Sequence, residues 1–163
     1  MSATVASAAP DTLPDWLCQQ LVLGSLPWEQ SIPYSEFCDR YTLCDSHWLG
    51  TFQQSNGAVA CIRWDLLWLP DTLFHQVGQA DAVYLFLKFE QLLGMAVTPG
   101  HVSARAGALS PSTAPAITNI ELEPVDEQHV LLVEDINECS TTVVFAGSLS
   151  CLAIAAHNQI IQL

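Results

Sequence analysis

Residues 48–64 read WLGTFQQSNGAVACIRW and contain the clearest local signal in the chain. Asn56-Gly57 is a dipeptide well suited to a type I′ turn, because both central positions of that turn need a positive φ. Folding about this turn sets three pairs of residues opposite each other: Leu49 and Trp64, Thr51 and Ile62, and Phe52 and Cys61. Aromatic and aliphatic side chains then lie on both faces of the hairpin. The stretch therefore predicts a β-hairpin inside a sheet that is covered on both sides.

Upstream of the hairpin the pattern predicts two short helices. Residues 14–23 place Trp16, Leu17 and Leu21 at helical spacing, with a proline in the first turn and Gly24 as the C-terminal stop. Residues 35–43 form a second candidate helix. Residues 1–12 are small and polar, with neither a basic segment nor an apolar core, which predicts a disordered tail rather than a secretory signal.

Downstream of the hairpin, residues 71–94 have the start and stop signals of one long helical segment, with Pro70 and Asp71 at its entry and Gly94 at its end. Residues 82–90 leave an alternative open, because their apolar side chains also alternate as in a buried strand. Helix is the favoured interpretation of this stretch. The segment is expected to pack on a mainly antiparallel sheet.

The C-terminal half predicts strands that follow a loop. Residues 98–116 are rich in Ala, Ser, Pro and Gly without periodicity, which is typical of a flexible loop. Apolar and alternating runs then follow at 120–123, 130–136, 141–146 and 149–155, separated by turn residues, and predict an antiparallel meander. Together these patterns indicate one α+β domain over residues 13–163, an ordinary size for a single domain.

Cations are scarce in this chain. Arg40, Arg63, Lys88 and Arg105 are the four basic residues, and the formal net charge is −13. Nucleic acid and anionic membrane surfaces are thereby excluded as partners, because binding to either depends on Lys and Arg. No run is long and apolar enough for membrane insertion, and a cytoplasmic location is expected. Half of the residues are apolar, which favours a homodimer or a stable partner that covers the exposed part.

No catalytic, cofactor-binding or metal-binding signature is present. The nearest approach to a metal set is Cys38, Cys44, His47 and Cys61, but its spacing matches no common zinc motif. The six cysteines are better explained as reduced thiols, mostly in the core. A cysteine nucleophile would also need a cationic neighbourhood, which this chain is poorly placed to supply. A function without catalysis is therefore favoured.

The candidate binding residues are acids near the C-terminus and one tryptophan. Residues 121–138 contain seven acids and no cation, and Glu121, Glu123, Asp126 and Glu127 are expected at an exposed hairpin tip. Trp28 lies in a proline-flanked linker where an exposed aromatic ring could anchor an interface. These residues suggest an acidic cytoplasmic adaptor, assembly factor, chaperone or inhibitor that masks a basic or apolar surface of a partner protein. The alternative is a small-molecule binder or small enzyme with a pocket between the sheet and the long helix, closed by the 98–116 loop.

Overall fold

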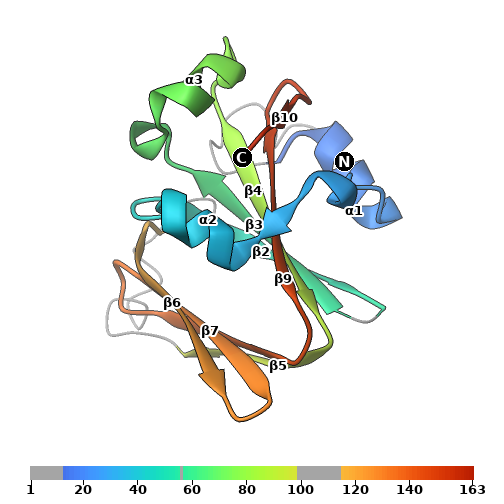
Figure 1. Cartoon of the computed structure of the whole chain (residues 1–163), viewed down its shortest axis with the longest axis vertical. Helices are drawn as coiled ribbons and strands as arrows, with labels where there is room; N and C mark the ends of the chain where they lie inside the picture. Colours follow the sequence, from blue (N-terminus) through green and yellow to red (C-terminus); the bar gives the residue numbers. More distant parts are fainter. Residues whose placement is uncertain (1–12, 56, 99–114) are drawn as a thin grey trace, which may run out of the picture.

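The computed structural model describes residues 13–55, 57–98 and 115–163, and these form two antiparallel sheets with three short α-helices (Figure 1). Sheet A has the strand order β1 (Ile32–Pro33), β9 (Leu149–Ala155), β4 (Val83–Glu90), β3 (Gly57–Trp64) and β2 (His47–Gln54), with β10 (Ile160–Ile161) also paired to β9. Sheet B has the order β5 (Leu92–Thr98), β8 (Ser140–Phe145), β7 (Gln128–Asp135) and β6 (Ile117–Val125). The predicted tail, 1–12, and most of the predicted loop, 99–114, lie outside the described residues. In the described part of the chain, no helix has both the length and the apolar character needed to cross a bilayer.

The long helical segment expected over residues 71–94 is absent, and the α+β architecture built on it is wrong. The stretch forms α3 (Asp71–Val77), then β4 and β5. Alternate side chains of β4 enter two different clusters of buried residues, with Leu85 and Leu87 on one face and Tyr84 and Phe86 on the other. A run buried on both faces is continuously apolar, which is why its sequence resembles a buried helix as closely as a strand. The fold is mainly β.

The hairpin predicted around residues 48–64 is present as β2 and β3, with a different register. Gln54 lies opposite Gly57 and Phe52 lies opposite Val59, so the pairing is displaced by two residues from the expected one. Over Gly50 to Gln54 this displacement of two keeps each side chain on its expected face. A bulge between Trp48 and Gly50 then places Leu49 in the same cluster as Phe52 instead of beside Trp64, and both faces are covered as predicted. Gly57 is the first residue of β3 rather than a turn residue, and its φ is not in the left-handed region.

Gly57 is where β3 begins its pairing with β4. It lies opposite Glu90, and a Cβ atom at this position would sit only 2.0 Å from the carbonyl oxygen of Phe89. A glycine in a strand often marks such a close approach of another backbone. The local preference of Asn56-Gly57 for a type I′ turn is therefore overridden by a contact between strands.

Helices cover sheet A on opposite sides. α1 (Asp15–Leu23) buries Leu17 and Leu21 against one face and ends at Gly24, which has a left-handed φ of 67°. On the other face, α2 (Tyr34–Arg40) and α3 pack in the same cluster of buried residues as the inner side of sheet B. The two predicted N-terminal helices are confirmed, with boundaries a few residues from those expected.

A shared corner joins the two sheets. Strands β4 and β5 are separated by Gln91, whose φ is 56°, and the opposing strands β8 and β9 are separated by residues 146–148. Backbone hydrogen bonds continue through the corner, from Ala146 N–H to the Gln91 carbonyl and from Gly147 N–H to the Glu90 carbonyl, both at 3.0 Å. Sheet B therefore turns away from the plane of sheet A and occupies one end of the molecule (Figure 1). The expected meander is present as β6, β7 and β8, whereas β9 leaves it and enters sheet A between β1 and β4.

Candidate functional site

Of the four acids expected at a hairpin tip, Asp126 and Glu127 form the tip, and Glu121 and Glu123 lie in the strand that leads to it. Strands β6 and β7 are joined by a two-residue turn, Asp126 and Glu127, in which Asp126 has a φ of 58°. Glu121 lies opposite Leu132, and Glu123 lies opposite Val130 on the neighbouring strand. All four acids are exposed to solvent. Residues two apart on a strand point to the same face, so Glu121 and Glu123 are neighbours on one side of sheet B.

The two faces of sheet B differ in what covers them. The inner face contributes Leu131, Val133, Val143 and Phe145 to the main core, where all four are buried. On the outer face, Val130, Leu132 and Val144 are only half-buried, and they belong to neither cluster of packed residues. Within the part of the chain that the structure describes, these three apolar side chains therefore have no covering layer.

Apolar and acidic side chains adjoin directly on this outer face. One row across the sheet contains Glu123, Val130, Val144 and Gly94, and the next contains Glu121, Leu132, Thr142 and Ala96. We define the acidic outer face as Glu121, Glu123, Asp126, Glu127, Val130, Leu132 and Val144. It consists of an apolar strip with carboxylates along one side and at the hairpin tip.

The acids near this surface fall into two groups, those that accept hydrogen bonds from neighbouring residues and those that do not. Glu134 accepts a hydrogen bond from the Asn119 side chain at 2.9 Å, and Asp135 accepts from the backbone N–H groups of Asn137 and Cys139 at 2.8 and 3.1 Å. These two carboxylates hold local structure. The side chains of Glu121, Glu123, Asp126 and Glu127 contact no other described side chain through a hydrogen bond or ion pair, and the described strands of sheet B contain no Lys or Arg. No Lys or Arg among the described residues pairs with these four carboxylates.

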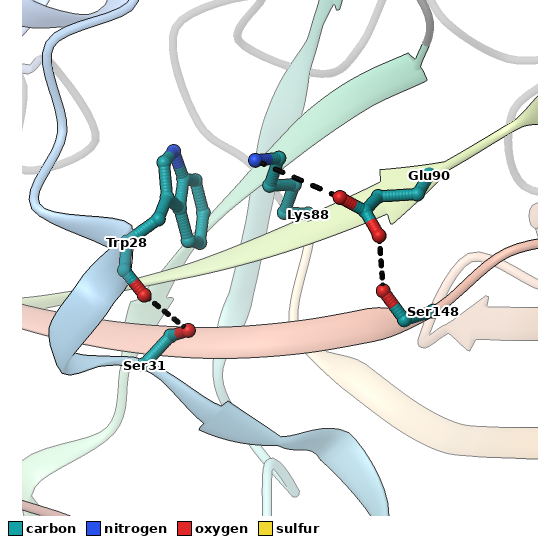
Figure 2. A network of polar contacts seen from close by, with 5 residues as sticks. All are labelled: Trp28, Ser31, Lys88, Glu90 and Ser148. Carbon is teal, nitrogen blue, oxygen red and sulfur yellow. Dashed lines mark hydrogen bonds and ion pairs between the residues drawn. The ribbon is translucent and has the colours of Figure 1, made fainter.

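Trp28, the other predicted binding residue, lies away from the acids. It begins the short helical turn η2 (Trp28–Gln30), is half-buried, and packs against the cluster on the α1 side of sheet A, which is the side opposite sheet B. Lys88 lies 5.4 Å from the centre of its ring and 3.9 Å from the Glu90 carboxylate, which also accepts a hydrogen bond from Ser148 (Figure 2). The structure therefore does not bring Trp28 together with Glu121, Glu123, Asp126 and Glu127.

The pocket expected between the sheet and a long helix lacks one of its walls, because the residues predicted to form that helix form α3, β4 and the start of β5. A surface depression of about 390 Å³ lies instead where the β2–β3 turn meets the β4–β5 corner. Its lining includes the polar residues Gln54, Ser55, Lys88, Glu90 and Gln91. This depression is open and polar, unlike the enclosed, mostly apolar pockets that bind small molecules.

None of the six cysteines forms a disulfide. The expectation that most are in the core is wrong, since Cys18, Cys38 and Cys44 are exposed and only Cys61 and Cys151 are buried. Cys61 packs on the α1 side of sheet A, whereas Cys38 lies on α2 across the sheet. Among the described residues, no three His, Cys, Asp or Glu side chains are grouped so that they could hold a metal ion.

The buried thiols should be far less reactive than the exposed ones. Burial raises the pKa of both Cys61 and Cys151 well above the ordinary value, so neither forms the reactive thiolate readily. With a thiol reagent at pH 8 we expect Cys18, Cys38 and Cys44 to react at least about 100-fold faster, because the buried pair must wait for opening of the fold. Mass spectrometry after timed quenching measures each site, and the unfolded protein is the control. Equal rates at Cys61 and Cys44 in the folded protein would contradict the burial described here.

Comparison with known proteins identifies no relative: no family model, no curated protein and no solved structure matches the chain. Its function therefore has to be inferred from its own surface. The acidic outer face combines two elements of a protein interface, apolar area that can be desolvated and charge that selects the partner. Val130, Leu132 and Val144 were not singled out from the sequence. The signal for Val130 and Leu132 was the run HVLLV at 129–133, which is apolar on both faces of its strand.

Proposed function

We propose that this protein is a non-catalytic protein-binding module that uses the acidic outer face to mask a basic surface of a partner protein. An adaptor, an assembly factor, a chaperone and an inhibitor all work in this way. The observation that supports the proposal is the open strip of Val130, Leu132 and Val144 beside carboxylates that no described cation neutralises. A partner with Lys and Arg around an apolar centre complements both parts.

Charge and apolar area have separate roles in this proposal. The formal net charge of −13 attracts a basic protein over distances comparable to the Debye length, about 8 Å at physiological salt, and so accelerates encounter. The apolar strip then contributes affinity when the two surfaces exclude water. Contact between two copies of this face would place carboxylates against carboxylates, so a basic partner fits it better than a homodimer does.

The proposed location is the cytoplasm. Six cysteines outside any disulfide, three of them exposed, suit a reducing compartment, where thiols do not oxidise to disulfides. A protein that spends its time bound to a partner also tolerates a half-open apolar surface more readily than an isolated monomer does.

Affinity capture with three baits tests the proposal. The first is the wild-type chain, and the second carries Glu121→Gln, Glu123→Gln, Asp126→Asn and Glu127→Asn. The third is a matched control with the same loss of four charges at exposed acids on other elements: Glu29→Gln, Asp39→Asn, Asp71→Asn and Asp81→Asn. We expect the wild type and the control to retain the same basic proteins from a cell extract at low salt, and the second bait to lose them. Equal retention by all three baits would show that the acidic outer face is not the binding surface.

A further inference from the structure

Strand β6 is an edge of sheet B, and the described residues pair with the side of β6 away from β7 only at its beginning. Asp45 N–H donates to the Ile117 carbonyl at 3.0 Å, and Ile117 N–H donates to the Ser46 carbonyl at 2.7 Å. His47 and Ala116 also form an antiparallel bridge. Beyond this point, no described strand lies along the outer side of residues 118–125. The segment 45–47 thus begins an antiparallel pairing that stops after its first residues.

The register of the hairpin shows which backbone groups of β6 face outward. Val125 and Gln128 flank a two-residue turn and lie opposite each other, which makes them a hydrogen-bonded pair. Hydrogen-bonded and non-bonded pairs alternate along an antiparallel ladder. Ile120, Leu122 and Pro124 are therefore at the non-bonded positions, where backbone groups point away from β7. Pro124 fits this arrangement, because proline is tolerated on an edge strand where its missing N–H would face solvent.

The side chains of β6 also divide by face. Glu121 and Glu123 project on the acidic outer face, whereas Ile120 and Leu122 project on the inner face, where Leu122 is 36% exposed at the margin of the core. If another strand lay beside β6, every second side chain of that strand would lie next to the carboxylates of the acidic outer face. The side chains between them would lie next to apolar surface on the inner face. Another copy of β6 would place its own carboxylates next to Glu121 and Glu123, and like charges on neighbouring strands are destabilising.

We infer that the partner contributes an extended segment of alternating basic and apolar residues, which adds to β6 as an antiparallel fifth strand of sheet B. This inference rests on the proposed function and specifies the partner's contact. The backbone groups of Ile120 and Leu122 and the Pro124 carbonyl supply main-chain hydrogen bonds, as in other cases of strand addition. Lys or Arg side chains of the segment lie over Glu121 and Glu123, and its apolar side chains cover Leu122.

A synthetic peptide of alternating Lys and Val is the probe, with binding measured by fluorescence anisotropy. In antiparallel addition the valines lie opposite Ile120 and Leu122 and exchange hydrogen bonds with them, whereas the lysine N–H groups point away. N-methylation of the valines should weaken binding at least about tenfold, and N-methylation of the lysines should leave it nearly unchanged. Equal affinities of the two methylated peptides, or no binding of the parent peptide up to about 1 mM, would overturn strand addition.

Two variants of one residue give the reciprocal test on the protein. Leu122→Ala removes the side chain and keeps the backbone donor, whereas Leu122→Pro also removes the donor at a position where an edge strand accepts proline. Both variants should keep the melting behaviour of the fold. Leu122→Ala should weaken peptide binding only by the lost apolar contact, whereas Leu122→Pro should weaken it at least about tenfold further, because it also removes a main-chain hydrogen bond. If Leu122→Pro keeps binding while the four-acid variant loses its partners, strand addition fails and the proposed function stands. A dimer in sedimentation that Leu122→Pro abolishes would assign the edge to a second copy and overturn the inference.

Discussion

Replacing Gly57 with valine is expected to lower the free energy of unfolding by about 3 kcal/mol or more, at the upper end of what overpacking costs. The new Cβ would lie 2.0 Å from the carbonyl oxygen of Phe89, which belongs to the backbone of the central strand β4. A flexible side chain can move aside, but a strand held on both sides cannot. Chemical denaturation followed by circular dichroism measures the change.

Gly94→Val is the matched control, because a Cβ on Gly94 meets nothing within 4 Å and the residue also lies in a strand. It should leave stability nearly unchanged. Gly57→Asn tests whether glycine is needed here for a positive φ in a turn or for the close approach of the Phe89 carbonyl. Asparagine is well accepted where a turn needs a positive φ, but it carries the same Cβ into the Phe89 carbonyl. Retained stability in Gly57→Asn would support a turn residue and contradict the strand contact.

The elements that could be predicted from the sequence are those whose signals are local. Helix α1 has its apolar spacing and its terminal glycine within ten residues, and the β2–β3 hairpin has its turn between two runs of strand-forming residues. The register could not be predicted, because it depends on the approach of β4 at Gly57. Nor could the strand character of 83–90, since it depends on pairing with β9, some sixty residues further along the chain.

The site divides in the same way. Glu121 and Glu123 were found because alternation along one strand is a local pattern, and their exposure follows from it. Which face of sheet B stays open depends instead on the corner at Gln91, which turns the inner face toward sheet A. Trp28 was expected to be exposed from its prolines. It packs beside Lys88, a residue sixty positions away that no local pattern connects with it.

Neutralising Glu121, Glu123, Asp126 and Glu127 is expected to slow association with a captured partner by roughly 10- to 100-fold at low salt. The four side chains make no contact that holds the described fold together, so the free energy of unfolding should change by less than about 0.5 kcal/mol. The dissociation rate should change much less than the association rate, because long-range attraction acts mainly before the surfaces meet. The control variant at Glu29, Asp39, Asp71 and Asp81 has the same net charge, and its association rate should fall far less.

The most direct measurement is the association rate constant of the wild type and of the four-acid variant at two ionic strengths, by stopped flow with the same partner. Steering by the acidic outer face predicts that the wild-type rate falls steeply as salt rises. The variant rate should be slow and nearly independent of salt, and the two proteins should converge at high salt. A variant that associates as fast as the wild type, with the same salt dependence, would contradict binding through the acidic outer face.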